Sequence, residues 1–335
     1  MKFSRNFGLA FFSFFVVALA ILAGAAIGEI PIPLTTFIKT LANYCFGAHY
    51  LVDTIDQKII WELRLPRSII AATTGASLAL CGVVLQSILR NALAEPYLLG
   101  ISSGAATGAV LVTIVGVGGG LFSISSGALI GGLLAFATVA FISYHSGRDN
   151  MAIILAGIAA GQLFTALTAL LMWIYGDSEV RGRILDWLLG NLSRARWEDV
   201  FYAIPVLFIS LIGFLSFARI LDAFVFGARS AESLGISLKY VTFFLISLVA
   251  VITAVNVSIV GTVGFVGLVI PHAARFIVGQ RHTRLLPLTA FIGAIFMVCA
   301  DIISRILIHG FAIPIGIVTA LIGAPCFVFL LVKRK

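Results

Sequence analysis

Stretches of about 20 consecutive apolar residues recur along the whole chain, and this pattern constrains the fold more than any other feature. Each stretch is long enough to cross the hydrocarbon core of a bilayer as an α-helix. Composition agrees, because 61% of the 335 residues are hydrophobic, 11% are charged and the mean hydropathy is +1.13. Lipid offers no hydrogen-bond partners to the backbone, and the two-residue alternation of a β-barrel is missing. The sequence therefore predicts an all-α, polytopic membrane protein.

We expect about ten transmembrane helices in a single domain that covers residues 1–335. Their expected positions are residues 7–27, 67–87, 97–117, 126–144, 151–175, 200–216, 240–260, a segment after 261–267 that carries Pro271 and His272, 285–307 and 315–332. Pro66 is expected at the entry to the second helix, after a long polar connection over residues 29–67. The polar loop 176–199 contains an amphipathic patch with a tryptophan, residues 184–189, which predicts a short helix at the membrane interface.

The first apolar run, residues 7–27, has two interpretations. Ala23-Gly24-Ala25 resembles the cleavage site of a signal peptide. The run is, however, longer than the roughly 7–15 apolar residues of a signal peptide core. We therefore expect it to be retained as the first helix.

Basic residues are distributed unequally between alternate loops. If the N-terminus lies inside, the inner segments hold 13 of the 22 Lys and Arg residues. This excess predicts that both termini and the loop 217–239 are cytoplasmic, whereas residues 28–67 and 176–199 face outward. The net charge of +8 lies in short loops, so we expect no nucleic-acid partner.

The loop 217–239 is too charged to lie in lipid, yet residues such as Leu221 and Phe224 keep one side apolar. Residues 223–226 and 228–234 each read as a short amphipathic turn, with a glycine break between them. An apolar face on a water-exposed loop needs a partner to cover it. The loop is therefore predicted to dock a soluble protein.

Two groups of charged residues allow alternative interpretations. Asp301 and Arg305 lie one helical turn apart inside an apolar run. They form either a proton relay or ligand site, or a structural pair in which Asp301 neutralises and orients Arg305. Asp301 is the only deeply placed acid, which favours the orienting role. Arg64 and Arg67 lie at the outer mouth of the second helix. They either reach the interface as isolated charges or join Arg305 in meeting carboxylates of an extracytoplasmic partner, and the spacing does not decide between these roles.

The tight turn after the second helix contains Asn91 and Leu93. It is either an ordinary turn or a gate, the latter if it faces its own copy across a dimer axis. The glycine-rich segments 100–106 and 261–267 permit close helix packing or line a path for a bulky solute.

The sequence contains none of the short motifs that carry common catalytic chemistry. It lacks the phosphate-binding pattern Gly-x-x-x-x-Gly-Lys-Ser/Thr, and also His-Glu-x-x-His, Cys-x-x-Cys and Gly-x-Ser-x-Gly. The four cysteines are scattered and suit packing, and the five histidines are far apart. We therefore expect neither enzymatic activity nor a metal or cofactor site.

Several longer motifs resemble one known family. They are Arg64-Leu65-Pro66-Arg67, Gly75-Ala76, residues 91–96 with 99–106, Leu155-Ala156-Gly157, residues 187–190, residues 264–272 and residues 314–325. In this order they are similar to the FecCD-type permeases of type II ABC importers, which handle iron-siderophores, haem and cobalamin. The resemblance covers nearly the whole chain. It implies an inner-membrane subunit that forms a homodimer or heterodimer, pairs with cytoplasmic ATP-binding subunits and receives solute from a periplasmic binding protein.

The resemblance also implies roles for individual residues. The ATPase-coupling helices would include Phe226, Gly227, Ala231, Leu234 and Gly235. Arg64, Arg67 and Arg305 would meet acidic residues of the binding protein, and Asn91 and Leu93 would belong to the cytoplasmic gate. Two departures matter: Ala228 stands where the family often has Glu, and Ala92 where it often has Pro. The second leaves the gate turn less rigid.

The expected function is therefore import of a metal chelate, with a ferric siderophore as the commonest cargo of such a permease. Haem, cobalamin or an oxyanion are the alternatives within the family. Two rivals come from other classes: an ion-coupled secondary carrier that uses Asp301, and a purely structural membrane subunit without a solute path.

Overall fold

The computed structural model describes residues 2–115, 123–147, 150–176, 178–226, 238–308 and 310–333. These residues form helices and no strand. The helices are α1 (Lys2–Ala26), α2 (Leu34–Phe46), α3 (Thr54–Lys58), the π-helix η1 (Ile59–Arg64), α4 (Leu65–Ile88), the 3-10 turn η2 (Pro96–Leu99), α5 (Ile101–Val115), α6 (Ile124–His145), α7 (Asn150–Tyr175), α8 (Ser178–Leu188), α9 (Trp197–Ser216), α10 (Ala218–Phe226), α12 (Leu238–Val260), α13 (Val266–Val278), α14 (His282–Ile306) and α15 (Ile315–Lys333).

The predicted membrane class is confirmed by the helices themselves. Within the described residues, six helical segments are long and apolar enough to cross a bilayer, and four shorter helices are also apolar. Each predicted span coincides with one of these helices, with ends shifted by a few residues. The chain is a multi-pass membrane protein.

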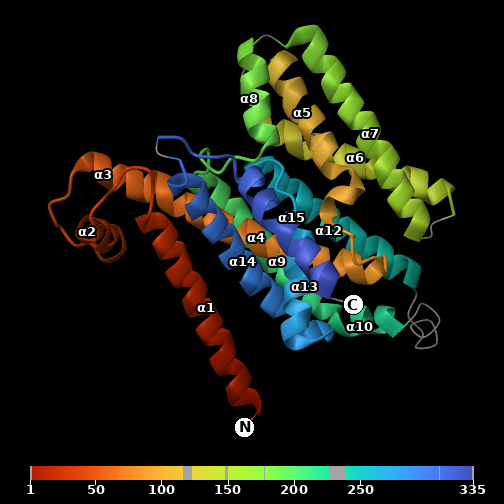
Figure 1. Ribbon diagram of the computed structural model, residues 1–335, viewed down its shortest axis with the longest axis horizontal. Coiled ribbons are helices and arrows are strands. Elements are labelled where there is room, and N and C mark those ends of the chain that lie inside the picture. The colour runs from red at the N-terminus through yellow and green to blue at the C-terminus, as the bar shows by residue number, and fades with distance from the viewer. Residues whose placement is uncertain are drawn as a thin grey trace.

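Helix α4 forms the centre of the bundle, with α9, α12, α13 and α14 packed around it (Figure 1). Of the most apolar 18-residue segment in the helical stretch that ends with α4, 94% is buried, against 22–61% for the corresponding segments of the other five long spans. Glycines allow this packing, because a Cβ at Gly75 would lie 2.2 Å from the carbonyl oxygen of Gly293 in α14. A Cβ at Gly82 would lie 1.9 Å from the carbonyl oxygen of Gly267 in α13. Small residues thus bring the backbones of three helices into direct contact.

Helices α5, α6, α7 and α8 form a second group beside this bundle (Figure 1). Glycines again set the spacing, because a Cβ at Gly108 in α5 would lie 2.0 Å from the carbonyl oxygen of Gly127 in α6. The hydroxyls of Thr107 and Thr168 lie 2.8 Å apart and link α5 to α7. Helix α12 packs against both α4 and α6 and so joins the two groups.

The polar connection over residues 29–67 is more ordered than the sequence predicts. It contains α2, which starts after Pro33 and ends at Gly47, a left-handed residue with φ of 65°. Only Phe37 and Thr40 of α2 are buried, so the helix is amphipathic and too short to span a bilayer. A search for long apolar runs therefore misses it.

The second predicted helix also starts earlier than expected. Pro66 does lie in the first turn of α4, but the helical path is continuous from Thr54 to Ile88. The six residues before α4 form the π-helix η1. Proline lacks a backbone N–H, and its ring clashes with a carbonyl in the preceding turn of an ordinary α-helix. The wider turn of a π-helix is one way to accommodate Pro66.

Candidate functional site

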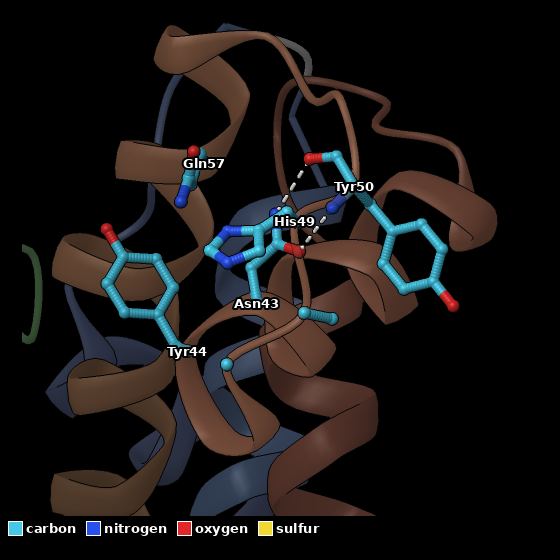
Figure 2. A pocket seen from close by; sticks show the side chains of 7 residues that line it. Asn43, Tyr44, His49, Tyr50 and Gln57 are labelled. Atoms are coloured by element: carbon cyan, nitrogen blue, oxygen red, sulfur yellow. Dashed lines mark hydrogen bonds between the residues drawn. The ribbon is translucent and has the colours of Figure 1, made fainter.

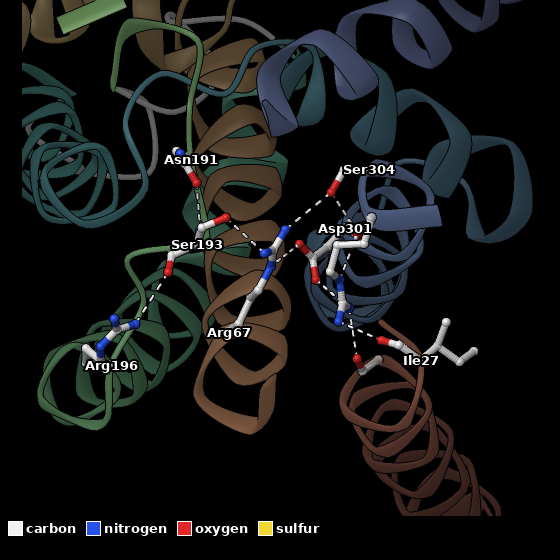
Figure 3. A network of polar contacts seen from close by, with 9 residues as sticks. Ile27, Arg67, Asn191, Ser193, Arg196, Asp301 and Ser304 are labelled. Atoms are coloured by element: carbon white, nitrogen blue, oxygen red, sulfur yellow. Dashed lines mark hydrogen bonds and ion pairs between the residues drawn. The ribbon is translucent and has the colours of Figure 1, made fainter. Parts of the chain in front are cut away.

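Four charged residues meet at the N-terminal end of α4, and we call them the arginine cluster: Arg64, Arg67, Asp301 and Arg305. Asp301 in α14 is fully buried, and each of its carboxylate oxygens faces an arginine (Figure 3). Arg67 Nε lies 2.7 Å from Asp301 Oδ1, and Arg305 Nη2 lies 2.7 Å from Asp301 Oδ2. The helical spacing of Asp301 and Arg305 predicts their proximity, whereas Arg67 arrives from another helix.

The same arginines close the C-terminal end of α1. Arg305 donates to the carbonyls of Gly24 and Ile27 at 2.8 and 2.7 Å. Arg64 donates to the carbonyl of Ala26 at 3.1 Å and also to that of Ile30. The last carbonyls of a helix lack intrahelical partners and carry partial negative charge, so guanidinium groups suit this place. The cluster therefore ties α1, α4 and α14 together.

The three arginines predicted to dock a binding protein lie together, but they differ in exposure. Arg64 and Arg305 are 6% and 4% exposed and direct their guanidinium groups to partners inside the chain. Arg67 lies nearer the surface and also donates to Ser193 Oγ at 3.0 Å and to Ser304 Oγ at 3.4 Å (Figure 3). Arg67 therefore links α4 to the loop that precedes α9.

The predicted gate residues form a turn directly after α4. Asn91 Oδ1 accepts a hydrogen bond from the backbone N–H of Leu93 at 2.9 Å, and Asn91 O accepts one from Ala94 at 3.0 Å. Arg90 enters this turn with φ of 50°, a left-handed conformation that is unusual for a residue with a side chain. Leu93 is 51% exposed, so its side chain is available to a partner surface.

A second polar cluster, the Ser–His–Asp chain, lies at the C-terminal end of α4 and was not predicted from the sequence. Ser87 Oγ lies 2.7 Å from Nε2 of His282, the first residue of α14. His282 Nδ1 lies 2.7 Å from Asp222 Oδ1 in α10, and this oxygen also accepts the backbone N–H of His282 at 2.8 Å. The sequence contains no local pattern that predicts this cluster, because His282 lies 60 residues from Asp222 and 195 residues from Ser87 along the chain.

The apolar face predicted on the loop 217–239 is partly covered by the protein itself. Leu221 and Phe224 of α10 are 0% and 4% exposed, and Leu221 belongs to the same core cluster as Ile88 at the end of α4. The expectation that this whole face awaits a partner is therefore wrong for Leu221 and Phe224. Phe226 ends α10, and Gly227, Ala231, Leu234 and Gly235 lie outside the described residues.

Tyr97 fixes the turn between α12 and α13 and is a further residue that the sequence did not indicate. Its hydroxyl donates to the carbonyl of Val263 and accepts from the N–H of the same residue, both at 2.7 Å. Burial raises the pKa of the neighbouring Glu95 carboxyl, against a hydrogen bond from the backbone of Phe265.

A hollow of about 420 Å³ lies where α2 and α3 are connected (Figure 2). Asn43 closes this connection by donating to the carbonyl of Tyr50 at 2.9 Å and accepting its N–H at 2.8 Å. Most of the residues that line the hollow are exposed, so the hollow is a surface feature rather than a path through the bundle. Among the described residues no three His, Cys, Asp or Glu side chains group to hold a metal ion.

The fold and these clusters define a multi-pass helical membrane protein whose polar networks connect helices. Residues 16–333 match the FecCD transport family. The chain is 39% identical over 313 residues to a cobalamin import system permease from Halobacterium salinarum, covering 92% of this chain and 81% of the relative. It is 36% identical to an Fe(3+) dicitrate transport permease from Escherichia coli, covering 94% and 96% of the two chains.

A solved structure gives the same result in three dimensions. An ABC transporter described as metal-chelate type, in an inward-facing conformation, superposes with a TM-score of 0.83 at 32% identity and covers 97% of this chain and 99% of its own. The chain belongs to the FecCD transport family and is a permease subunit of an ABC importer.

Proposed function

We propose that this permease imports a metal chelate, with a ferric siderophore as its cargo, across the inner membrane from periplasm to cytoplasm. The observation that carries the proposal is the similarity over nearly the full length to a transporter described as metal-chelate type. The ferric dicitrate relative supports the same cargo class. The relative named as a cobalamin importer supports cobalamin as the alternative cargo.

In this proposal the chain works as one of two permease subunits, each with ten transmembrane helices and both termini in the cytoplasm. Separate ATP-binding subunits dock on residues 217–239 and hydrolyse the ATP. A periplasmic binding protein delivers the chelate at the end of the bundle that carries Arg64, Arg67 and Arg305. The turn with Asn91 and Leu93 forms the cytoplasmic gate. This gate and the outer mouth of the path open in turn, so that the solute moves inward.

The secondary-carrier rival needs Asp301 to exchange protons during transport. In the structure Asp301 is 0% exposed and both carboxylate oxygens face arginines. No water-accessible side of the carboxylate remains for proton exchange. This arrangement supports an orienting role for Asp301 and counts against proton coupling through this residue.

The direct test is uptake into proteoliposomes that contain the permease, its cognate ATPase subunits and its binding protein. The probes are a ⁵⁵Fe-labelled ferric hydroxamate, ferric dicitrate, hemin, cyanocobalamin and molybdate. We expect ATP-dependent uptake of a ferric chelate that stops when the ATPase subunits are omitted. Uptake that follows a proton gradient without ATP would overturn the proposal, and uptake of cyanocobalamin alone would select the alternative cargo.

A further inference from the structure

The Ser–His–Asp chain connects three elements that meet on the side of the bundle where α4 ends. Asp222 belongs to α10, His282 opens α14, and Ser87 lies in the last turn of α4. His282 is 1% exposed and sits between the other two. A displacement of α10 therefore reaches α4 through one buried imidazole ring.

The link holds in either charge state of the imidazole. A carboxylate oxygen only accepts hydrogen bonds, so Nδ1 of His282 carries a proton toward Asp222. When the ring is neutral, Nε2 accepts the single Ser87 hydroxyl proton, which is then not donated to the carbonyl of Val83. When the ring is charged, Nε2 donates to Ser87 Oγ and the hydroxyl donates to Val83. The connection is consequently mechanical and does not require titration.

A Ser–His–Asp arrangement also occurs in hydrolases, but the geometry here does not serve nucleophilic attack. Ser87 is 7% exposed, and its hydroxyl lies 2.8 Å from the carbonyl of Val83 in the preceding turn of α4. A nucleophile needs an oxygen that a substrate reaches and donors that stabilise an oxyanion beside it. A buried hydroxyl bonded within its own helix is suited to holding helices in register.

Both ends of this chain adjoin segments with proposed roles in transport. Asp222 lies four residues before Phe226, and the remaining proposed ATPase-coupling residues follow it. Ser87 lies four residues before Asn91 and the proposed gate turn. Apolar packing supports the connection, because Leu221 of α10 and Ile88 of α4 are 0% and 1% exposed in one core cluster.

We infer that His282 is a positioning residue that transmits displacement of α10 to the gate turn after α4. The inference rests on the proposed function, since it requires an ATPase that moves residues 217–239. Its partners are Asp222, which fixes the ring and the N-terminus of α14, and Ser87, which receives the displacement.

The test measures whether α10 and the gate turn move as one body. Spin labels are placed at two exposed positions, Leu93→Cys and Arg219→Cys, after the four native cysteines have been replaced by serine or alanine. Pulsed electron paramagnetic resonance then gives the distance distribution between the labels, for the purified subunit and for its complex with the ATPase subunits, with and without ATP. In the otherwise unchanged protein we expect one narrow distribution that keeps its width in all states.

Substitutions distinguish the link from general packing. Ser87→Ala removes the bond between α4 and the imidazole, and Asp222→Ala removes both bonds that Asp222 accepts from His282. Each substitution should broaden the distribution. Asp222→Asn keeps an oxygen acceptor for the two N–H groups of His282 and should restore the narrow distribution. Ser77→Ala is the matched control, because Ser77 is a buried serine on the same helix whose hydroxyl has no hydrogen-bond partner. A narrow distribution in all variants, or equal broadening by Ser77→Ala, would overturn the inference.

A functional measurement on the reconstituted importer completes the test. Ser87→Ala should lower the ferric chelate transported per ATP by about fivefold, the factor expected for one lost hydrogen bond, while ATP hydrolysis itself persists. Unchanged transport per ATP would contradict the inference. Failure of the subunit to bind any ATPase would refute the proposed function instead, and the distances in the isolated subunit would still decide whether the link exists.

Discussion

The two ends of α4 are held in different ways. At the N-terminal end, guanidinium groups make several bonds each, to a buried carboxylate, to serines and to the last carbonyls of α1. At the C-terminal end, α4 meets α10 through a single line of hydrogen bonds through His282, with apolar packing around it. Further bonds in the last turns join Gln86 to α13 and Ile88 to Asn150 of α7, but none of them reaches α10. Multiple charged bonds fix geometry in all directions, whereas a single line passes on a displacement along one direction. We therefore call the N-terminal end of α4 the anchored end and its C-terminal end the responsive end.

The largest effect is expected from breaking the anchored end. Asp301→Asn removes the charge that faces Arg67 and Arg305 and leaves two buried cations uncompensated. The free energy of unfolding should fall by about 3–5 kcal/mol. Denaturant titration of the purified subunit in detergent micelles measures the change. Asp186→Asn on exposed α8 is the control and should change stability by less than about 0.5 kcal/mol; equal effects of the two would break the comparison.

A smaller loss of stability is expected from a substitution in the middle of α4. In Gly82→Ala the new methyl group would lie 1.9 Å from the carbonyl oxygen of Gly267, so α13 must shift away. Overpacking of this kind reduces stability by about 1–3 kcal/mol. Gly182→Ala serves as the control, since a Cβ there meets open space. Thermal unfolding of both variants would show whether backbone contact is required, and an unchanged midpoint for Gly82→Ala would contradict it.

The turn between α12 and α13, which Tyr97 of η2 holds, offers a third test. Tyr97→Phe removes the hydroxyl that bonds both the N–H and the carbonyl of Val263, a residue that is 1% exposed. Leaving buried backbone groups without this partner should lower the free energy of unfolding by about 1–2 kcal/mol. Tyr202→Phe, at a position that is 66% exposed, should have no effect. If both variants unfold alike, the hydroxyl does not hold the turn.

The smallest effect concerns Glu95, whose pKa is raised by burial. A group with a raised folded pKa contributes stability below its unfolded pKa, and this contribution is lost as pH rises through the folded pKa. The subunit should therefore lose a small part of its stability as pH increases through this range. Glu95→Gln cannot ionise and should flatten this part of the profile, as measured by unfolding midpoints between about pH 4 and pH 8. An identical slope in both proteins would refute the assignment.

The sequence predicts the spans well because lipid imposes long apolar runs, and α14 and α15 begin within a few residues of their expected starts. It misses α2, whose 13 residues are amphipathic rather than apolar. The pairing of Asp301 with Arg305 is visible because helical geometry places residues four apart on one face. The second partner, Arg67, comes from a different helix, and only the folded arrangement brings it within reach.

The same limit applies to the Ser–His–Asp chain. Asp222 reads as a loop charge and His282 as part of a short polar turn, so neither residue indicates the other. Roles assigned to Phe226, Gly227, Ala231, Leu234 and Gly235 stay predictions, as do those of the docking arginines and the gate residues. These roles concern contacts with other chains, which one sequence does not encode by itself.

The arginine cluster has a consequence for biosynthesis. Arg67 is translated 234 residues before Asp301, so the early helices enter the membrane while their counter-ion does not yet exist. Until α14 follows, Arg67 has no contact with this carboxylate. The junction of α4 with α14 at this end of the bundle is therefore completed only late in synthesis, after most of the other helices have been made.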